Sequence, residues 1–257
     1  MRQRKIKDIE LKIQDYMDLA VEDPIALRGS WRGLFSDKGS GIDLDADLEL
    51  GSDADLELGS DAEPYADLEA EFDAGFDSSG LFVEIGCGKG RFIVSSAEAN
   101  PDAGFIAIEG FSSVIYRAMQ KVRASEVKNV RFILDFVFDL GTWFADGELD
   151  GIFLNFSDPW PKKKNAKRRL TYRDRLEQYA KALKPGGFLR IKTDNDAFFE
   201  FTLEELGAVK DRCGFTVEFM TNDLHNSPWT NQSPMTEYES KFAEAGKNIN
   251  FLALKKI

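Results

Sequence analysis

Short apolar segments alternate with longer amphipathic segments between Leu81 and Thr193. The short segments contain mainly branched and aromatic residues, as buried strands do. The strands that we expect from them are Leu81–Gly86, Phe105–Ile108, Val130–Leu134, Gly151–Phe156 and Phe188–Thr193. Strands that alternate with helices are typical of a doubly wound, mostly parallel α/β sheet with flanking helices, and the pattern predicts this fold.

The amphipathic segments between these strands predict three helices. The helices are Arg91–Ala99, a helix that carries Val114, Ala118 and Val122 on one stripe, and Tyr172–Leu183. Ser112 or Ser113 is expected to cap the second helix, because serine hydroxyls accept from the free N–H groups of a first turn. The third helix is expected to end at Lys184–Gly187, which contains a proline and two glycines.

An acidic residue stands at or close to the end of each expected strand. These residues are Glu84, Glu109, Asp135, Asp158 and Asp194. The carboxyl ends of parallel strands lie at one edge of a sheet, where ligands bind in doubly wound folds. Acidic residues also cap helices, so one of them alone would carry little information. Five on successive strands predict a shared acidic site.

A glycine-rich loop, Gly86-x-Gly88-x-Gly90, follows the first strand. Glycine lets the backbone turn tightly and approach a ligand without a clash from Cβ. The dinucleotide fingerprint is GxGxxG, which presents a helix N-terminus to a pyrophosphate, whereas this chain has GxGxG. Glu84 lies two residues before the loop, where a carboxylate suits an ammonium or sulfonium group, and Glu109 is placed to accept from ribose hydroxyls. S-adenosylmethionine meets both demands, and we expect it as the cofactor.

The segment after the fourth strand is strongly basic. Lys162–Arg175 contains eight basic residues and one acid, and the prolines at 159 and 161 stiffen the turn before it. A charge run is more often a solvated helix face, but this one lies beside the expected acidic site and next to Trp160 and Tyr172. We therefore expect a phosphate-binding surface for nucleic acid. Trp160 is expected either to stack on a base or to pack within the protein.

The net charge of the 257-residue chain, −12, comes from one segment. Between Asp37 and Asp77 there are 15 acidic residues and one basic residue, which leaves 32 basic and 30 acidic residues elsewhere. The octapeptide DADLELGS occurs at 45–52 and again at 53–60, too few copies to stack into a core. We expect residues 37–79 to be an acidic, low-complexity, disordered insert between an N-terminal arm (1–36) and the main domain (80–257). As an alternative, the insert mimics a polyanion and competes for the basic surface.

Several classes of protein are not expected from the composition. Apolar residues make up 43 % of the chain and charged residues 30 %, as in globular proteins. No apolar run approaches the roughly 20 residues of a membrane span, and the polar N-terminus lacks the apolar core of a signal peptide. Cys87 and Cys213 are far apart, and no His/Cys cluster accompanies the carboxylates. We expect a cytoplasmic protein without a membrane partner or a metal site. A homo-oligomer is compatible with the sequence, which carries no signal for the oligomeric state.

Six segments of the sequence closely resemble the bacterial tRNA (guanine-N7)-methyltransferases. They are VEIGCGKG, AIEGFSSV, LNFSDPWPKKKNAKRRLTY, IKTDN, DLHNS and MTEYESKF. The SDPWPKK and TEYE elements are far more specific than the glycine loop, and the resemblance runs from Leu81 to the C-terminus and takes in part of the N-terminal arm. It implies a Rossmann-like, S-adenosylmethionine-dependent methyltransferase domain whose partner is tRNA. The methylated atom would be N7 of guanine 46 in the tRNA variable loop.

The resemblance also implies residue roles, position by position. The cofactor contacts, with the glycine loop, fall on Glu84, Gly86, Gly88, Gly90, Glu109, Asp135 and Asp158. Asp158 is also the implied catalytic residue. The substrate contacts fall on Lys162, Asp194, Thr236, Glu237, Tyr238 and Glu239. The chain departs from the family at Phe136, where alanine is usual, and in the insert. His225, the only histidine, is expected to be a structural hydrogen-bonding residue of its loop.

Two other functions stay open on the sequence. A methyltransferase of another RNA or of a small molecule would make the basic segment incidental. A non-catalytic RNA-binding protein would retain only the fold, which the intact glycine loop and the acidic residues disfavour. An NAD-dependent dehydrogenase is disfavoured by GxGxG in place of GxGxxG.

Overall fold

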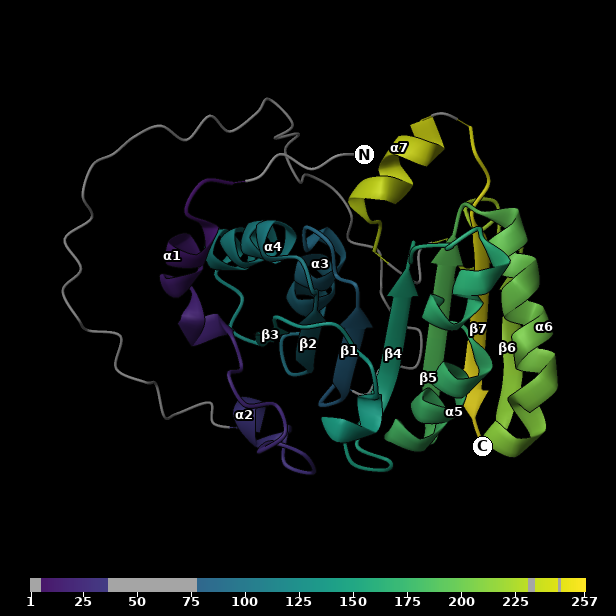
Figure 1. The fold of residues 1–257 in the computed structure, drawn as a ribbon, viewed down its shortest axis with the longest axis horizontal. Helices are drawn as coiled ribbons and strands as arrows, with labels where there is room; N and C mark the ends of the chain where they lie inside the picture. The colour runs from purple at the N-terminus through teal and green to yellow at the C-terminus, as the bar shows by residue number, and fades with distance from the viewer. Residues whose placement is uncertain (1–5, 37–77, 231–233, 245) are drawn as a thin grey trace.

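The computed structural model describes residues 6–36, 78–230, 234–244 and 246–257 (Figure 1). The expected acidic insert, residues 37–79, lies outside the described residues except for Ser78 and Ser79, so its disorder stays a prediction. Within the described ranges, every helix is too short or too polar to span a lipid bilayer.

Seven strands form one sheet in the order β3-β2-β1-β4-β5-β7-β6 (Figure 1). They are β1 (Leu81–Ile85), β2 (Gly104–Ile108), β3 (Val130–Ile133), β4 (Leu149–Asn155), β5 (Leu183–Thr193), β6 (Phe215–Thr221) and β7 (Asn250–Lys256). Strands β1 to β5 are parallel, whereas β7 pairs antiparallel with β5 and β6. The strand order reverses between β1 and β4, so their carboxyl ends form the topological switch point, where doubly wound sheets bind ligands. The predicted doubly wound, mostly parallel sheet is confirmed.

Helices cover both faces of this sheet (Figure 1). The α-helices are α1 (Ile9–Gln14), α2 (Gly33–Ser36), α3 (Arg91–Ala99), α4 (Ser112–Ser125), α5 (Arg173–Ala182), α6 (Asp196–Cys213) and α7 (Glu237–Glu244). Short 3-10 helices are η1 (Met17–Leu19), η2 (Leu140–Thr142) and η3 (Lys163–Arg168). Successive strand residues point to opposite faces, so Phe82 joins the core under α3 and α4, whereas Val83 joins the core under α5 and α6.

Residues 6–36 contribute to both cores. Ile13 of α1 is buried in the core under α3 and α4. Trp31 is fully buried in the other core, and its Nε1 donates a hydrogen bond to the carbonyl oxygen of Trp143 at 2.7 Å. Between these anchors, the backbone N–H of Val21 donates to the carbonyl of Phe132 at the edge of β3, at 2.8 Å. The N-terminal segment therefore packs along the domain that it precedes.

Two local predictions are wrong. Strand β5 begins at Leu183 and not at Phe188, because Leu183 already pairs with Leu149; residues 184–187 leave the ladder before pairing resumes at Phe188.

Helix α4 has Phe111 as its N-cap residue and no side-chain capping hydrogen bond, so neither Ser112 nor Ser113 caps it. A carboxylate from the preceding turn takes over part of this role, since Glu109 Oε1 accepts from the Phe111 N–H at 3.0 Å.

Candidate active site

The acidic residues expected at the strand ends share one edge of the sheet, because β1 to β5 are all parallel. The negative charges of Glu109 and Glu237 both raise the pKa of Glu84, and the negative charge of Asp158 raises the pKa of Glu109. Glu237 comes from the first turn of α7, which lies beyond the carboxyl ends of the central strands (Figure 1). Four carboxylates from three strand ends and one helix thus lie near enough to one another around the switch point to interact electrostatically.

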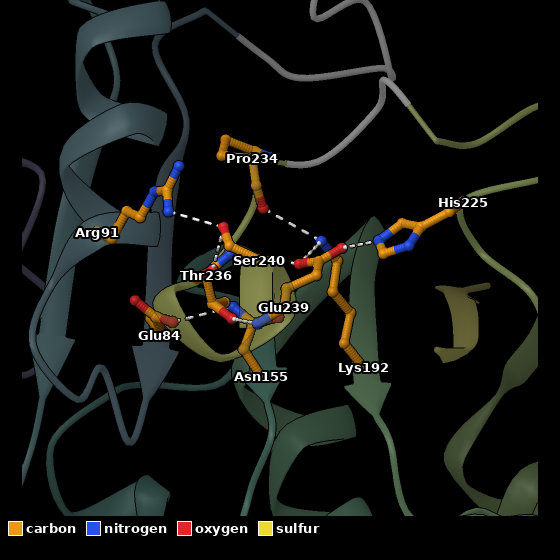
Figure 2. A network of polar contacts seen from close by, with 9 residues as sticks. All are labelled: Glu84, Arg91, Asn155, Lys192, His225, Pro234, Thr236, Glu239 and Ser240. Carbon is orange, nitrogen blue, oxygen red and sulfur yellow. Dashed lines mark hydrogen bonds and ion pairs between the residues drawn. The ribbon is translucent and has the colours of Figure 1, made fainter. Parts of the chain in front are cut away.

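Glu84 is a buried carboxyl group that is only half satisfied. Its side chain projects from β1, and its Oε1 accepts a hydrogen bond from Asn155 Nδ2 of β4 at 2.9 Å (Figure 2). Among the described residues, none donates to its buried Oε2. Burial raises the pKa of Glu84 to about 8; the Asn155 hydrogen bond opposes this shift, and the nearby charge of Glu237 adds to it. An unpartnered buried oxygen of this kind fits a ligand that carries a cationic group.

The three glycines of the loop after β1 have different roles. All three have positive φ angles of 80° at Gly86, 58° at Gly88 and 84° at Gly90. A Cβ on Gly86 or Gly88 would meet open space, whereas one on Gly90 would lie 2.7 Å from Cβ of Ala118 in α4. Gly90 therefore lets α3 pack closely on α4, while Gly86 and Gly88 leave bare backbone where a ligand can approach.

Glu109 is held by the turn that follows β2. Its carboxylate accepts hydrogen bonds from the backbone N–H groups of Gly88, Gly110 and Phe111, which lower its pKa. Burial has the larger effect and raises the pKa of Glu109 overall, with a further rise from the charge of Asp158. The side chain links the glycine loop to the end of β2, where the sequence places the ribose of an adenosine.

Asp158 lies in a strained loop directly after β4. Phe156 and Trp160 flank it with φ angles of 52° and 40°, which non-glycine residues rarely adopt. The backbone N–H of Phe156 donates to the carbonyl of Lys192 in β5 at 2.9 Å, so the loop is tied to the neighbouring strand. Asp158 itself is exposed. Strain of this kind is typical of sites where a side chain is held for function.

The basic segment runs outward from this loop. Lys162 is exposed and precedes η3, whose lysines are exposed as well. The guanidinium of Arg168 lies 5.0 Å from the ring centroid of Trp160, and Arg169 donates to the Trp160 carbonyl oxygen at 3.1 Å. Trp160 therefore packs against the segment's own arginines and remains partly exposed. Cationic side chains thus border the edge that carries the carboxylates.

The four residues of the TEYE segment divide into two pairs. Thr236 and Glu239 are buried, whereas Glu237 is half-buried and Tyr238 is exposed. Glu237 forms an ion pair with Lys121 of α4. The ring of Tyr238 stacks on that of Phe156, with centroids 6.4 Å apart and planes 22° apart. Glu237 and Tyr238 thus lie between α4 and the Asp158 loop.

Two predicted site residues, Asp135 and Asp194, make no contact with these carboxylates in the described part of the chain. Asp135, after β3, is exposed, and its Oδ1 accepts from the Phe136 N–H at 2.6 Å. The Phe136 ring meets that of Phe111 edge to face and lies where a Cβ on Gly110 would be. Asp194, after β5, makes no hydrogen bond or ion pair with the described residues and is partly exposed.

Sequence reasoning missed three residues that hold the site. Asn155 fixes Glu84, and Lys192 is buried within β5 (Figure 2). Lys121 pairs with Glu237. The signal available for Lys192 was a lysine within a strand that is expected to be buried, because a charged side chain is rarely buried without a partner. Nothing in the sequence singled out Asn155 or Lys121.

The described side chains fit a cationic, adenosine-bearing cofactor such as S-adenosylmethionine. The unpartnered Glu84 oxygen, the bare backbone of Gly86 and Gly88, and the Glu109 carboxylate all lie around the glycine loop. No group of three or more histidine, cysteine, aspartate or glutamate residues in the described ranges is arranged to hold a metal ion.

Comparisons with known proteins agree with this geometry. Residues 78–252 match a family model described as "Putative methyltransferase". The tRNA (guanine-N(7)-)-methyltransferase of Geobacillus kaustophilus is 39 % identical over 238 residues, which cover 93 % of this chain and 89 % of that protein. The enzyme of the same name from Halalkalibacterium halodurans is 42 % identical over 169 residues, which cover 66 % of this chain and 74 % of that protein.

A solved structure supports the fold. The rRNA methylase of Streptococcus thermophilus superposes with a TM-score of 0.51 at 16 % identity, over 73 % of this chain and 92 % of that one. At this identity the likeness concerns the arrangement of strands and helices alone.

Proposed function

Because this chain belongs to the tRNA (guanine-N(7)-)-methyltransferase family, we propose that it methylates N7 of guanine 46 in the variable loop of tRNA. It is an S-adenosylmethionine-dependent methyltransferase that modifies tRNA and forms N7-methylguanosine. The proposal rests on one observation, that a site suited to a cation and a basic surface lie next to each other at the end of β4. On one side lies the half-satisfied Glu84, which suits a cation, and on the other lies the basic segment that begins at Lys162.

We assign six residues to cofactor binding, namely Glu84, Gly86, Gly88, Glu109, Asp135 and Asp158. S-adenosylmethionine supplies a methyl group on a positively charged sulfur. Ionised Glu84 would bind a cationic group of the cofactor, Glu109 would accept from the ribose hydroxyls, and the glycine backbone would let the ligand approach closely. Gly90, which the family pattern also includes, acts through the packing of α3 on α4.

Asp158 is the residue that we assign to catalysis. Guanine N7 has a free lone pair, so no base has to remove a proton before the methyl group is transferred. Alignment of the two reactants can supply up to roughly 7–11 kcal/mol in favourable systems. As the purine becomes positively charged, a carboxylate held beside it stabilises that charge. Asp158, Asp194 and Glu237 also offer acceptors for the N1 and N2 donors of the guanine edge.

The tRNA would lie across the basic segment and α7. Lys162 and the neighbouring lysines would neutralise phosphates, which gives affinity without sequence specificity. Glu237 and Tyr238 complete the substrate side of the site that we propose. Thr236 and Glu239, which the family pattern also includes, are bonded to each other in the turn that carries them. Modification of tRNA is consistent with a cytoplasmic location. We propose that the acidic insert (37–79) is a linker between the arm (1–36) and the methyltransferase domain (80–257).

The proposal is tested by incubating the full chain with methyl-labelled S-adenosylmethionine and bulk tRNA from cells that lack N7-methylguanosine. The product nucleosides are then identified by mass spectrometry. Labelled N7-methylguanosine is expected, and tRNA that already carries this modification is the matched control that should take up little label. Label in another nucleoside, or no label despite cofactor binding, would point to another substrate. No cofactor binding at all would favour the non-catalytic RNA-binding alternative.

A further inference from the structure

Lys192 and Glu239 form a buried ion pair that joins β5 to α7 (Figure 2). Lys192 Nζ lies 2.9 Å from Glu239 Oε2, and the two side chains are only 1 % and 2 % exposed. Lys192 Nζ also donates to the carbonyl oxygen of Pro234 at 3.1 Å. The other carboxylate oxygen of Glu239 lies 3.1 Å from His225 Nε2. The ion pair and its partners therefore connect β5, the loop after β6 and the segment that leads into α7.

The same carboxylate belongs to a capping box at the start of α7. The backbone N–H of Glu239 donates to Thr236 Oγ1 at 3.0 Å, and the N–H of Thr236 donates back to Glu239 Oε2 at 3.3 Å. This reciprocal pair, three residues apart, satisfies two N–H groups of the first turn and fixes where the helix begins. The first and last residues of TEYE thus face the protein interior.

The two middle residues of TEYE face the candidate site. Glu237 pairs with Lys121 of α4 and acts electrostatically on Glu84, and Tyr238 stacks on Phe156 beside the Asp158 loop. Ser240, one residue after the box, accepts from Arg91 of α3 at 2.7 Å (Figure 2). The first turn of α7 therefore bridges the α3–α4 side of the switch point and the β4–β5 side.

We propose that Glu239 and Lys192 are positioning residues of the methyltransferase site, and that within TEYE only Glu237 and Tyr238 meet the tRNA. The catalytic part of this inference rests on the proposed function. Glu239 is saturated by three partners and buried, so little of it is available to a substrate. Loss of either member of the pair leaves an uncompensated charge in the interior, whereas replacement of both by uncharged residues is often neutral. The pair thus holds Glu237 and Tyr238 in place through the first turn of α7.

The test compares Lys192→Met, Glu239→Gln and the double variant in the full chain. Hydrogen exchange of the backbone amides of residues 237–240 is measured without tRNA. Each single variant should exchange at least about tenfold faster than the wild type, and the double variant should return to within about threefold of it. Unchanged exchange in Glu239→Gln would overturn the proposal, because a residue that only contacts tRNA would not alter the free protein.

The second readout is kcat/KM for tRNA in the same variants. We expect a loss of at least about tenfold in each single variant and recovery in the double variant. If the double variant remains as poor as Glu239→Gln, the carboxylate acts on the substrate directly and the inference fails. A wild-type chain that transfers no methyl group to tRNA would refute the proposed function, while the exchange measurement would still test the inference.

A milder pair of variants covers the case in which a single variant does not fold. Thr236→Ala removes the hydroxyl that accepts from Glu239, and Thr236→Ser retains it. Faster exchange at residues 237–240 is expected in Thr236→Ala than in Thr236→Ser. Equal exchange in the two would show that the capping box does not hold the turn, and would overturn the proposal.

Discussion

Glu84 Oε1 accepts a hydrogen bond from Asn155 Nδ2 across the switch point, at 2.9 Å. Glu84 is the last residue but one of β1, Asn155 is the last residue of the neighbouring parallel strand β4, and both are buried. Asn155 satisfies only one oxygen of the carboxyl group and fixes its orientation, and no described residue donates to the other oxygen, where we propose that a cationic group binds. This relationship explains how an acidic side chain in the core of the sheet can serve as the cation contact of a cofactor site.

We expect the affinity for S-adenosylmethionine to rise between pH 5.5 and pH 7.5. The pKa of Glu84 is about 8 in the free protein, and a cation bound beside it favours the carboxylate and lowers that pKa. Binding therefore releases a proton in this range, and affinity increases by up to about tenfold per pH unit. Calorimetry in buffers of different ionisation enthalpy measures both the affinity and the proton release.

Glu84→Gln is the control for this pH dependence. It should bind S-adenosylmethionine weakly, with the pH slope and the proton release both lost. The same raised pKa makes the wild type less stable relative to Glu84→Gln as pH increases from about 4.5 towards 8, because the unfolded chain ionises first. A wild-type affinity that is flat with pH would contradict the assignment of Glu84.

Gly88→Ala and Gly90→Ala should separate ligand binding from packing. Both place a side chain at positive φ, which costs about 1–2 kcal/mol. Gly90→Ala adds a clash with Ala118, which should lower the free energy of unfolding by a further roughly 1–3 kcal/mol and so give the lower melting temperature. Gly88→Ala should instead weaken cofactor affinity at a smaller loss of stability. Thermal melts and calorimetry check this, and equal melting temperatures would refute the close packing at Gly90.

Asp158→Asn should lower turnover much more than it lowers cofactor affinity. The substitution preserves size at an exposed position but removes the negative charge that we assign to stabilising the purine cation. A loss of about 100-fold or more in kcat is expected, with a much smaller rise in the dissociation constant of S-adenosylmethionine. Single-turnover kinetics and calorimetry measure the two quantities. Unchanged turnover would rule out Asp158 as the catalytic residue.

The parallel half of the fold could be predicted from the sequence because its signals are local. An apolar run such as Phe105–Ile108 followed by Glu109 identifies both a strand and its carboxyl end, and the glycine loop identifies the strand that precedes it. The antiparallel strands β6 and β7 were not predicted, because β6 pairs with a strand 29 residues further on, at the C-terminus. Such pairing depends on long-range contacts that no local pattern records.

The roles of individual site residues were less predictable for the same reason. TEYE was interpreted as one substrate-binding unit, yet Thr236 and Glu239 face inward as a capping box. The inward direction of Glu239 depends on Lys192, 47 residues earlier in the chain. The expectation that His225 is a structural hydrogen-bonding residue agrees with its contact to Glu239, which likewise exists only once β5 and α7 are together.

Deletion of residues 40–78 should leave the domain folded. The repeated acidic octapeptides cannot form a core of their own, and circular dichroism and thermal melts check this prediction. If the insert competes for the basic segment, tRNA affinity at low salt should increase on deletion, and the difference should shrink as salt increases. Equal affinity at every salt concentration would leave the insert as a linker only.

The most direct measurement of the central claim compares two transcripts of one tRNA, with guanine or adenine at position 46. Each is incubated with the full chain and methyl-labelled S-adenosylmethionine, and the digested fragments are mapped by mass spectrometry. The account predicts one labelled methyl group at N7 of guanine 46 and no label in the adenine transcript. Equal labelling of the two transcripts, or a methyl group on another atom, would contradict it.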